Sequence, residues 1–350
     1  MTSITVCLPE ERLLKLQELA ARLTISPDEL ARIGVEELLA LPDDEFQRAM
    51  DDVLKKNAEL YLRLHPEVPN VIDVRTWEEF EEELKKLRKE RDERQQKPGP
   101  LPSGLLFRGQ ENSCWPLTTT LERSKREGIA LADYYDLVCR VKPQIETFVG
   151  PNWDIPEYGE IKKSVQGYET FFDELLFGRI PAYDFLAYLR HHGFPSPLLD
   201  WTRSPYIAAF FAFRYAQSGS EKVSIYVYQE SPHGGKGRSS SKPQIKSLTP
   251  YVRTHRRHSL QQCEYTICVI FEIDGQGWRF AEHENVFARE ASQNFQQDVL
   301  WKFNIPSTER LKVLELLEEY NLNAFSLFGS EESLTETMAL RELDFRKKDS

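Results

Sequence analysis

The segment PYIAAFFAF, residues 205–213, limits the fold of this 350-residue chain more than any other feature. It follows Ser204, and Pro205 takes the first helical position, a combination that favours the start of a helix. The helix would be apolar on nearly every side, and such a helix has to be buried. The sequence therefore predicts a domain large enough to enclose a whole helix.

Strand and helix patterns are mixed in the region around this segment. The expected strands are 70–74, 105–109, 223–229 and 265–273, where β-branched and aromatic residues concentrate. The expected helices are 76–96, 130–149 and 168–193, and residues 307–343 read as helix, strand and helix. The predicted fold class is therefore α+β, with the main domain spanning 68–350.

A different pattern occupies residues 1–45. Ile4, Val6 and Leu8 alternate with polar residues, which predicts a short half-buried strand, and helices are predicted to begin at Pro9 and Ser26. One strand and two short helices cannot bury a core alone, so a twofold dimer with paired strands is expected. Residues 46–67 continue as a connecting helix.

This order of elements resembles the ribbon-helix-helix module of bacterial repressors and antitoxins. Members of that family that bind DNA use the outward residues of the strand, which here are Ser3, Thr5 and Cys7. None of the three is basic, so dimerisation is favoured over DNA binding.

The composition narrows the classes of function. The formal charge of −11 disfavours a chain that coats nucleic acid, although a local basic patch stays open. Five cysteines without a CxxC pair indicate free thiols in a reduced cytoplasm and no zinc site. No apolar run is long enough for a membrane helix.

Three polar clusters are candidates for a functional site. Arg108 and Gly109 end the strand 105–109, and an arginine can clamp a phosphate while a glycine lets a ligand approach the backbone. Asp200, Thr202 and Ser204 crowd the start of the apolar helix, where an anion could bind or where the side chains could simply cap the helix.

The third cluster opens the strand 265–273. Gln262 and Glu264 would share one face if the strand reached them, and could orient a ribose or oppose a developing positive charge; a polar strand end is the alternative. His191 and His192 are adjacent and must point different ways, so they cannot bind one metal ion as a helical i, i+4 pair. His192 is kept as a residue that could line the cleft.

Taken together, FRG at 107–109, RHHGFPSPLLDWTRSPYIAAFFAF, RRHSLQQCEYT and the closing segment 311–343 resemble the FRG domain of bacteria and their phages over about residues 70–345. The motif order is similar to that of ADP-ribosyltransferases of the arginine–serine–glutamate type, which implies a split β-sheet core and NAD as co-substrate. This resemblance implies that Arg108, Gln262 and Glu264 are catalytic. It also implies that Arg108, Thr202 and Ser204 hold NAD. Gly109, His192 and Asp200 are expected to bind NAD with them, because they flank these residues or could line the cleft.

The leading hypothesis is a dimeric toxin or phage-defence effector that transfers ADP-ribose to a protein or nucleic acid. One alternative is a non-catalytic nucleotide- or DNA-binding regulator. A second is a nuclease or hydrolase that uses Asp200, His192 and Glu264, with a metal ion.

Overall fold

The computed structural model describes residues 70–96, 103–124, 128–150, 153–216, 221–237, 242–272, 277–291 and 296–346, with a few positions between 20 and 30. The chain divides into two compact units, Met1–Glu67 and Val68–Ser350. None of the helices in the described part is long and apolar enough to cross a membrane.

The predicted ribbon-helix-helix module (1–45) and connecting helix (46–67) lie outside the described residues, apart from those few positions. Among these, the Ser26 hydroxyl accepts a hydrogen bond from the Glu29 N–H at 3.1 Å. The Leu30 N–H donates to the Ser26 carbonyl at 3.0 Å. These are the bonds of a capped helix start, as the sequence predicts at this serine.

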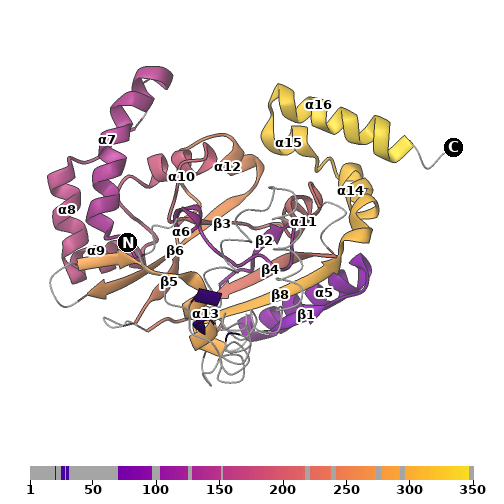
Figure 1. Cartoon of the computed structure of the whole chain (residues 1–350), viewed down its shortest axis with the longest axis horizontal. Helices are drawn as coiled ribbons and strands as arrows, with labels where there is room; N and C mark the ends of the chain where they lie inside the picture. The colour runs from indigo at the N-terminus through magenta and orange to yellow at the C-terminus, as the bar shows by residue number, and fades with distance from the viewer. Residues whose placement is uncertain are drawn as a thin grey trace. The chain divides into compact units, whose positions relative to one another are not determined.

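A mixed eight-stranded sheet runs through the unit Val68–Ser350 (Figure 1). The strands are β1 (Val71–Asp73), β2 (Leu106–Gln110), β3 (Leu199–Thr202), β4 (Lys222–Glu230), β5 (Gln244–Ser247), β6 (Cys263–Glu272), β7 (Gly277–Phe280) and β8 (Asp298–Pro306). Their order is β1-β8-β4-β2-β3-β6-β5, with β7 also paired to β6. Among these strands β1 and β8 are parallel, and every other pair is antiparallel. A mixed fold of helices around a sheet is thus confirmed.

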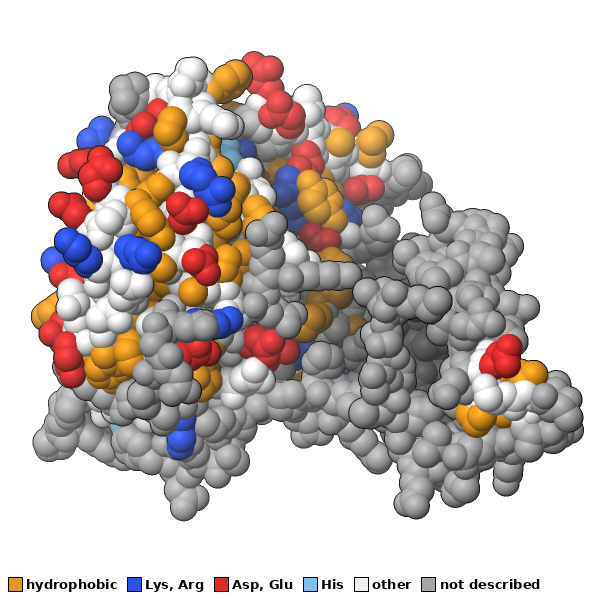
Figure 2. Space-filling view, turned by 60° about the vertical axis from the view of Figure 1, so that its left-hand side comes forward, with side chains coloured by type: hydrophobic (Ala, Val, Ile, Leu, Met, Phe, Trp, Pro, Cys, Tyr) orange, Lys and Arg blue, Asp and Glu red, His pale blue; other side chains and the backbone are white. Residues whose placement is uncertain are grey.

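Helices pack around the sheet. They are α5 (Trp77–Gln95), α6 (Thr120–Arg123), α7 (Leu131–Val149), α8 (Tyr158–Gln166), α9 (Tyr168–Leu176), α10 (Tyr183–His191), α11 (Pro205–Phe213), α12 (Arg257–Leu260), α13 (His283–Ala291), α14 (Arg310–Glu319), α15 (Ala324–Phe328) and α16 (Glu331–Ala339). In Figure 1, α7–α9 lie at the left of the sheet and α14–α16 at the upper right. Figure 2 shows the molecule turned by 60° from the view of Figure 1. On the face seen there, acidic and basic side chains of the described residues are interspersed.

Helix α11 is buried, as its apolar sequence predicts. Ser204 caps it by accepting a hydrogen bond from the Ile207 N–H at 3.3 Å. The helix lies against β2, where a Cβ added to Gly109 would come within 1.9 Å of the Ala208 carbonyl oxygen and 2.6 Å of the Ala212 nitrogen. The need for glycine at this position therefore comes from helix packing, because the helix backbone fills the space that a side chain would take.

Strands β2 and β3 are joined by the fewest paired residues in the sheet. These two strands pair at one position, Phe107 with Thr202, whereas β2 pairs with β4 at five. Separate apolar clusters lie on either side of this junction: one unites α5, α11 and α14 with β4 and β8, and another unites α7–α10 with β6 and β7. A third cluster, which includes Leu106, Leu199 and Trp201, crosses the junction and packs β2 together with β3.

One predicted strand is wrong. The segment around 322–328 was expected to be extended between two helices, but it forms α15. Asn323 caps this helix, because its side chain accepts from the Ser326 N–H at 2.9 Å while the Ser326 hydroxyl accepts from the Asn323 N–H at 3.1 Å. A reciprocal cap of this kind favours a helix over the strand that the apolar residues suggest.

Candidate functional site

The three polar clusters of the sequence meet at the junction of β2 and β3. Strand β3 pairs with β6 so that Trp201 lies opposite Glu264 and Thr202 lies opposite Cys263. Strand β2 joins them through the contact between Phe107 and Thr202. Segments 108–109, 200–204 and 262–264, far apart in the sequence, are thus neighbours in space.

Arg108 forms an ion pair across this junction. Its Nη1 donates to an Asp200 carboxylate oxygen at 2.5 Å and to the Asp200 carbonyl oxygen at 2.9 Å. Arg190, in the last turn of α10, donates from Nη2 to the same carboxylate oxygen at 2.6 Å. Two guanidinium groups therefore share a single carboxylate.

The charges of this cluster do not balance. Burial acts to raise the pKa of Asp200, but Arg108 and Arg190 outweigh it and hold the pKa far below its usual range, so the carboxylate stays ionised. Partial burial of the Arg123 guanidinium, and then the positive charges of Arg108 and Arg190, lower the pKa of Arg123. Burial also raises the pKa of the adjacent Glu122 to about 7. Arg108 and Arg190 are thus paired with one ionised carboxylate, and Arg123 is near enough for their charges and that of Glu122 to act on it.

Two buried donors in this cluster are unused. The Nε atoms of Arg108 and Arg190 are buried and have no hydrogen-bond partner among the described residues. A buried polar group without a partner is costly, and its usual partner is a water molecule or a ligand. The surplus of positive charge and the unused donors both suit an anion.

Thr202 and Ser204 are committed to the start of α11. The Thr202 hydroxyl accepts from the Ser204 N–H at 3.2 Å, and the Ser204 hydroxyl caps the helix. Of the three side chains that could cap α11, Ser204 does so, Thr202 bonds the capping residue itself, and Asp200 pairs with the arginines instead. Each hydroxyl still has its own proton to donate.

Glu264 lies at the start of β6 with its carboxylate 3.7 Å from the Arg203 Nε. Burial raises the pKa of Glu264, and the charge of Arg203 opposes this rise. Gln262 precedes the strand in a left-handed conformation with φ 48°, and its side chain is exposed. The alternation that would place Gln262 and Glu264 on one face therefore does not extend to Gln262. Its carbonyl accepts from the Arg203 N–H at 3.1 Å.

His191 and His192 point in different directions, as their adjacency requires. His191 is half-buried, and its Nε2 lies 2.8 Å from the Tyr265 hydroxyl. His192 is exposed, stacks on Tyr188 with ring centroids 4.2 Å apart, and lines a cavity of about 600 Å³ with residues at the end of α7. The structure thus places His191, rather than His192, beside the arginine cluster, where the Asp200 charge acts on it.

A second cavity, of about 400 Å³, opens beside the start of β6. Its lining includes Arg203 and Cys263 from the segments described above. It also includes His258, Arg253 and Tyr251, of which Tyr251 is 89% exposed. Neither Arg108 nor Ser204 belongs to this lining. Two arginines and an exposed aromatic ring suit a ligand with phosphate and a planar group.

Several residues of the site were not predicted as such. Arg190 directly precedes the His191–His192 pair, of which His192 was the residue kept for the cleft. Arg203 lies inside the predicted 200–204 segment, so proximity in sequence was the available signal. Tyr251 and Arg253 lie in an irregular segment, and only the fold brings them to β6.

Comparison with known proteins supports the resemblance to the FRG domain in part of the chain. The model of the FRG domain family matches residues 103–221, which include β2, α10, β3 and α11. No curated protein matches the chain. No solved structure matches it either.

Proposed function

We propose that the junction of β2, β3 and β6 binds NAD and transfers its ADP-ribose group to a protein or nucleic acid. The observation that carries the proposal is the gathering of Arg108, Arg190 and Arg123 around Asp200, with two buried guanidinium donors unused. A pyrophosphate would supply negative charge and accept hydrogen bonds from the two unused Nε–H groups. Asp200, held by two arginines, is better suited to position them than to act as a base or metal ligand.

Glu264 takes the electrostatic role in the proposed reaction. The bond between the ribose C1′ and the nicotinamide nitrogen breaks, and its electron pair leaves with neutral nicotinamide. Positive charge then develops on the ribose, and the target nucleophile forms a bond to C1′ and gives its proton to water. The Glu264 carboxylate would oppose the developing charge, and Arg203, 3.7 Å away, would favour the ionised form against the effect of burial.

The remaining predicted residues have supporting roles in this proposal. Thr202 and Ser204 would hold the start of α11 against the ligand and donate from their hydroxyls. Gln262, exposed before β6, would contact the target, and Gly109 would act through the packing of α11 on β2. The split-sheet core of ADP-ribosyltransferases is part of the proposal, supported by the single pairing between β2 and β3. Residues 1–45 are proposed to dimerise the chain, and the effector role in toxicity or phage defence is proposed with them.

The test is transfer of label from adenylate-labelled NAD to components of a bacterial extract. The wild-type protein should transfer label, and Glu264→Gln should slow the transfer by about 10²–10³-fold, as for loss of one transition-state contact. Glu272→Gln, at the other end of β6, is the matched control and should be unchanged. Absence of both label transfer and nicotinamide release by the wild type would contradict the proposal.

A further inference from the structure

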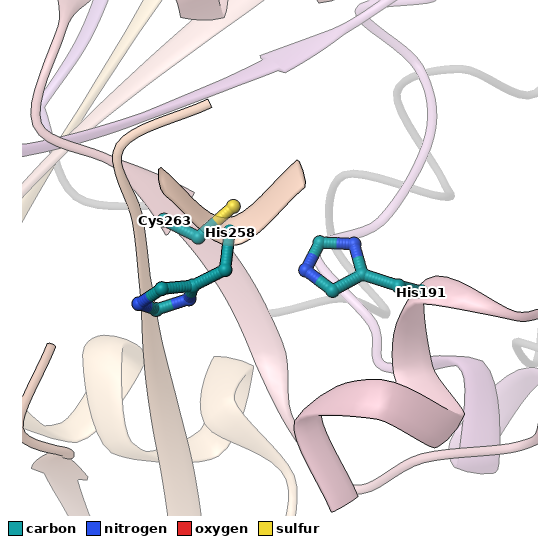
Figure 3. A group of neighbouring side chains, drawn as sticks. All are labelled: His191, His258 and Cys263. Carbon is teal, nitrogen blue, oxygen red and sulfur yellow. The ribbon is translucent and has the colours of Figure 1, made fainter. Parts of the chain in front are cut away.

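A group of three potential metal ligands lies beside the proposed site. His191 comes from the end of α10, His258 from α12 and Cys263 from the start of β6. Their ligand atoms all lie within 4.8 Å of one another. Figure 3 shows the three side chains near one another on separate elements, with the His191 ring directed towards the other two and the His258 ring turned away from His191.

Hydrogen bonding fixes the tautomer of His258. Its Nε2 lies 2.8 Å from the Pro250 carbonyl oxygen, which can only accept, so Nε2 carries the proton. Nδ1 is therefore left with a free lone pair. A ring nitrogen bound to a backbone carbonyl, with the other turned towards the ion, is the usual arrangement of a metal-binding histidine.

The Tyr265 hydroxyl lies among these groups. It is 2.8 Å from His191 Nε2 and 3.4 Å from His258 Nδ1. A phenol has one proton, so it can donate to only one of the two imidazoles. The shorter distance favours His191 Nε2, so His258 Nδ1 has only a weak contact to the hydroxyl.

Cys263 is buried with weak contacts of its own. Cys263 is only 5% exposed. Its Sγ lies 3.9 Å from the Arg257 carbonyl oxygen and 3.8 Å from the Gln261 side-chain oxygen. Neither contact is strong enough to prevent the sulfur from binding an ion. His258 and Cys263 also line the cavity of about 400 Å³, so one side of the group is reachable from solvent.

Against the expectation from the sequence that the chain has no zinc site, we infer that His191, His258 and Cys263 form a site for a divalent transition metal ion. Zn²⁺ is the ion that two imidazoles and a thiolate suit best. Ligand atoms around tetrahedral Zn²⁺ stand roughly 3.3–3.8 Å apart, given bonds of about 2.0–2.3 Å. The present separations of up to 4.8 Å close to that range when the side chains move inward by about an ångström. The fourth position is left to the Tyr265 hydroxyl or to a water molecule in the cavity.

Such an ion would tie α10, α12 and β6 together beside Arg190 and Asp200. It would thereby fix the end of α10 that carries Arg190, one of the arginines of the anion cluster. This inference does not rest on the proposed reaction, since the metal site can exist whether or not NAD is the ligand next to it.

The test is titration of the tag-free, full-length protein with Co²⁺, whose bond to a thiolate gives a charge-transfer absorption in the near ultraviolet. The wild type should bind one equivalent with that absorption, and Zn²⁺ should displace it and raise the melting temperature. Cys263→Ala should lose the absorption, and His191→Gln should weaken binding at least tenfold. Cys268→Ala, which removes another buried thiol of the same strand, is the matched control and should keep it.

Two results would overturn the inference. One is a folded wild-type protein that shows no thiolate-to-cobalt absorption. The other is an absorption that persists unchanged in Cys263→Ala. If Cys263→Ala fails to fold, as judged by circular dichroism, His191→Gln decides the matter, because His191 is only half-buried and its loss spares the core.

Discussion

At the scale of single residues, the site depends on Asp200 and the two arginines that it joins. The Arg108 side chain is 11% exposed and that of Arg190 18%, whereas the Asp200 side chain is 39% exposed. The carboxylate therefore separates two enclosed positive charges while remaining accessible from solvent. Without it, the two guanidinium groups would repel each other with little water to screen them.

Asp200→Asn should lower the free energy of unfolding by about 2 kcal/mol, less than for a fully buried ion pair because the carboxylate is partly solvated. Urea denaturation measures the change. Asp136→Asn, which breaks the exposed pair between Asp136 and Arg140 in α7, is the control and should change stability by less than about 0.5 kcal/mol. Equal effects of the two substitutions would mean that the Asp200 pair is not enclosed.

His283 gives the fold a dependence on pH. It is fully buried with Nε2 3.0 Å from the Thr266 hydroxyl, and burial, followed by Arg108 and Lys236, lowers its pKa to about 3. The unfolded chain takes up a proton near pH 6.5, so the stability from this residue is complete above pH 6.5 and falls as the pH falls towards 3.

This one histidine should cost the protein about 2 kcal/mol of stability between pH 7 and pH 5. Urea denaturation at each pH measures the free energy of unfolding. In His283→Gln this free energy should fall by about 2 kcal/mol less between pH 7 and pH 5 than in the wild type. His233→Gln, at an exposed position, should keep the wild-type slope. Parallel curves for wild type and His283→Gln would show that the buried imidazole does not resist protonation.

Residue identity in the sequence predicted only part of the site. Arg108, Asp200 and Glu264 were singled out because they flank strand or helix ends, and the fold does bring their segments together. The choice of His192 over His191 could not be made from sequence, because it depends on the direction in which α10 ends. The pairing of Arg190 with Asp200 depends on where the fold brings the end of α10 relative to β3, which no local pattern encodes.

At the scale of elements, the packing of α11 on β2 leaves no room for a side chain at Gly109. The apolar sequence predicted that α11 is buried, and Gly109 allows its backbone to approach the strand. Strand β8 was not among the predicted strands, although it pairs with β4 at nine positions. Its sequence, DVLWKFNIP, mixes polar and apolar residues, so its central place comes from pairing rather than from a clear local pattern.

Gly109→Ala should destabilise the protein by about 3 kcal/mol or more, because the added methyl group meets helix backbone that cannot rotate away. Gly104→Ala is the matched control, since a Cβ there meets nothing within 4 Å, and it should change stability by less than about 0.5 kcal/mol. Thermal unfolding followed by circular dichroism compares the two. A tolerated Gly109→Ala would contradict the close packing of α11 on β2.

At the scale of the whole molecule, the predicted dimer remains to be tested. Light scattering should give the full chain twice its monomer mass of 40.8 kDa, because residues 1–45 are expected to pair. A chain that begins at Val68 should be monomeric, since it lacks the pairing strand. A monomeric full-length protein at micromolar concentration would contradict the ribbon-helix-helix prediction.

The central claim is that the junction of β2, β3 and β6 is an anion site that takes NAD, and calorimetric titration with NAD tests it most directly. The wild type should bind NAD, and Arg123→Gln should weaken binding about tenfold, because it removes one positive charge without breaking the Asp200 ion pairs. Arg140→Gln on α7 should leave the affinity unchanged. No binding of NAD by the wild type, or equal affinities for wild type and Arg123→Gln, would contradict the account.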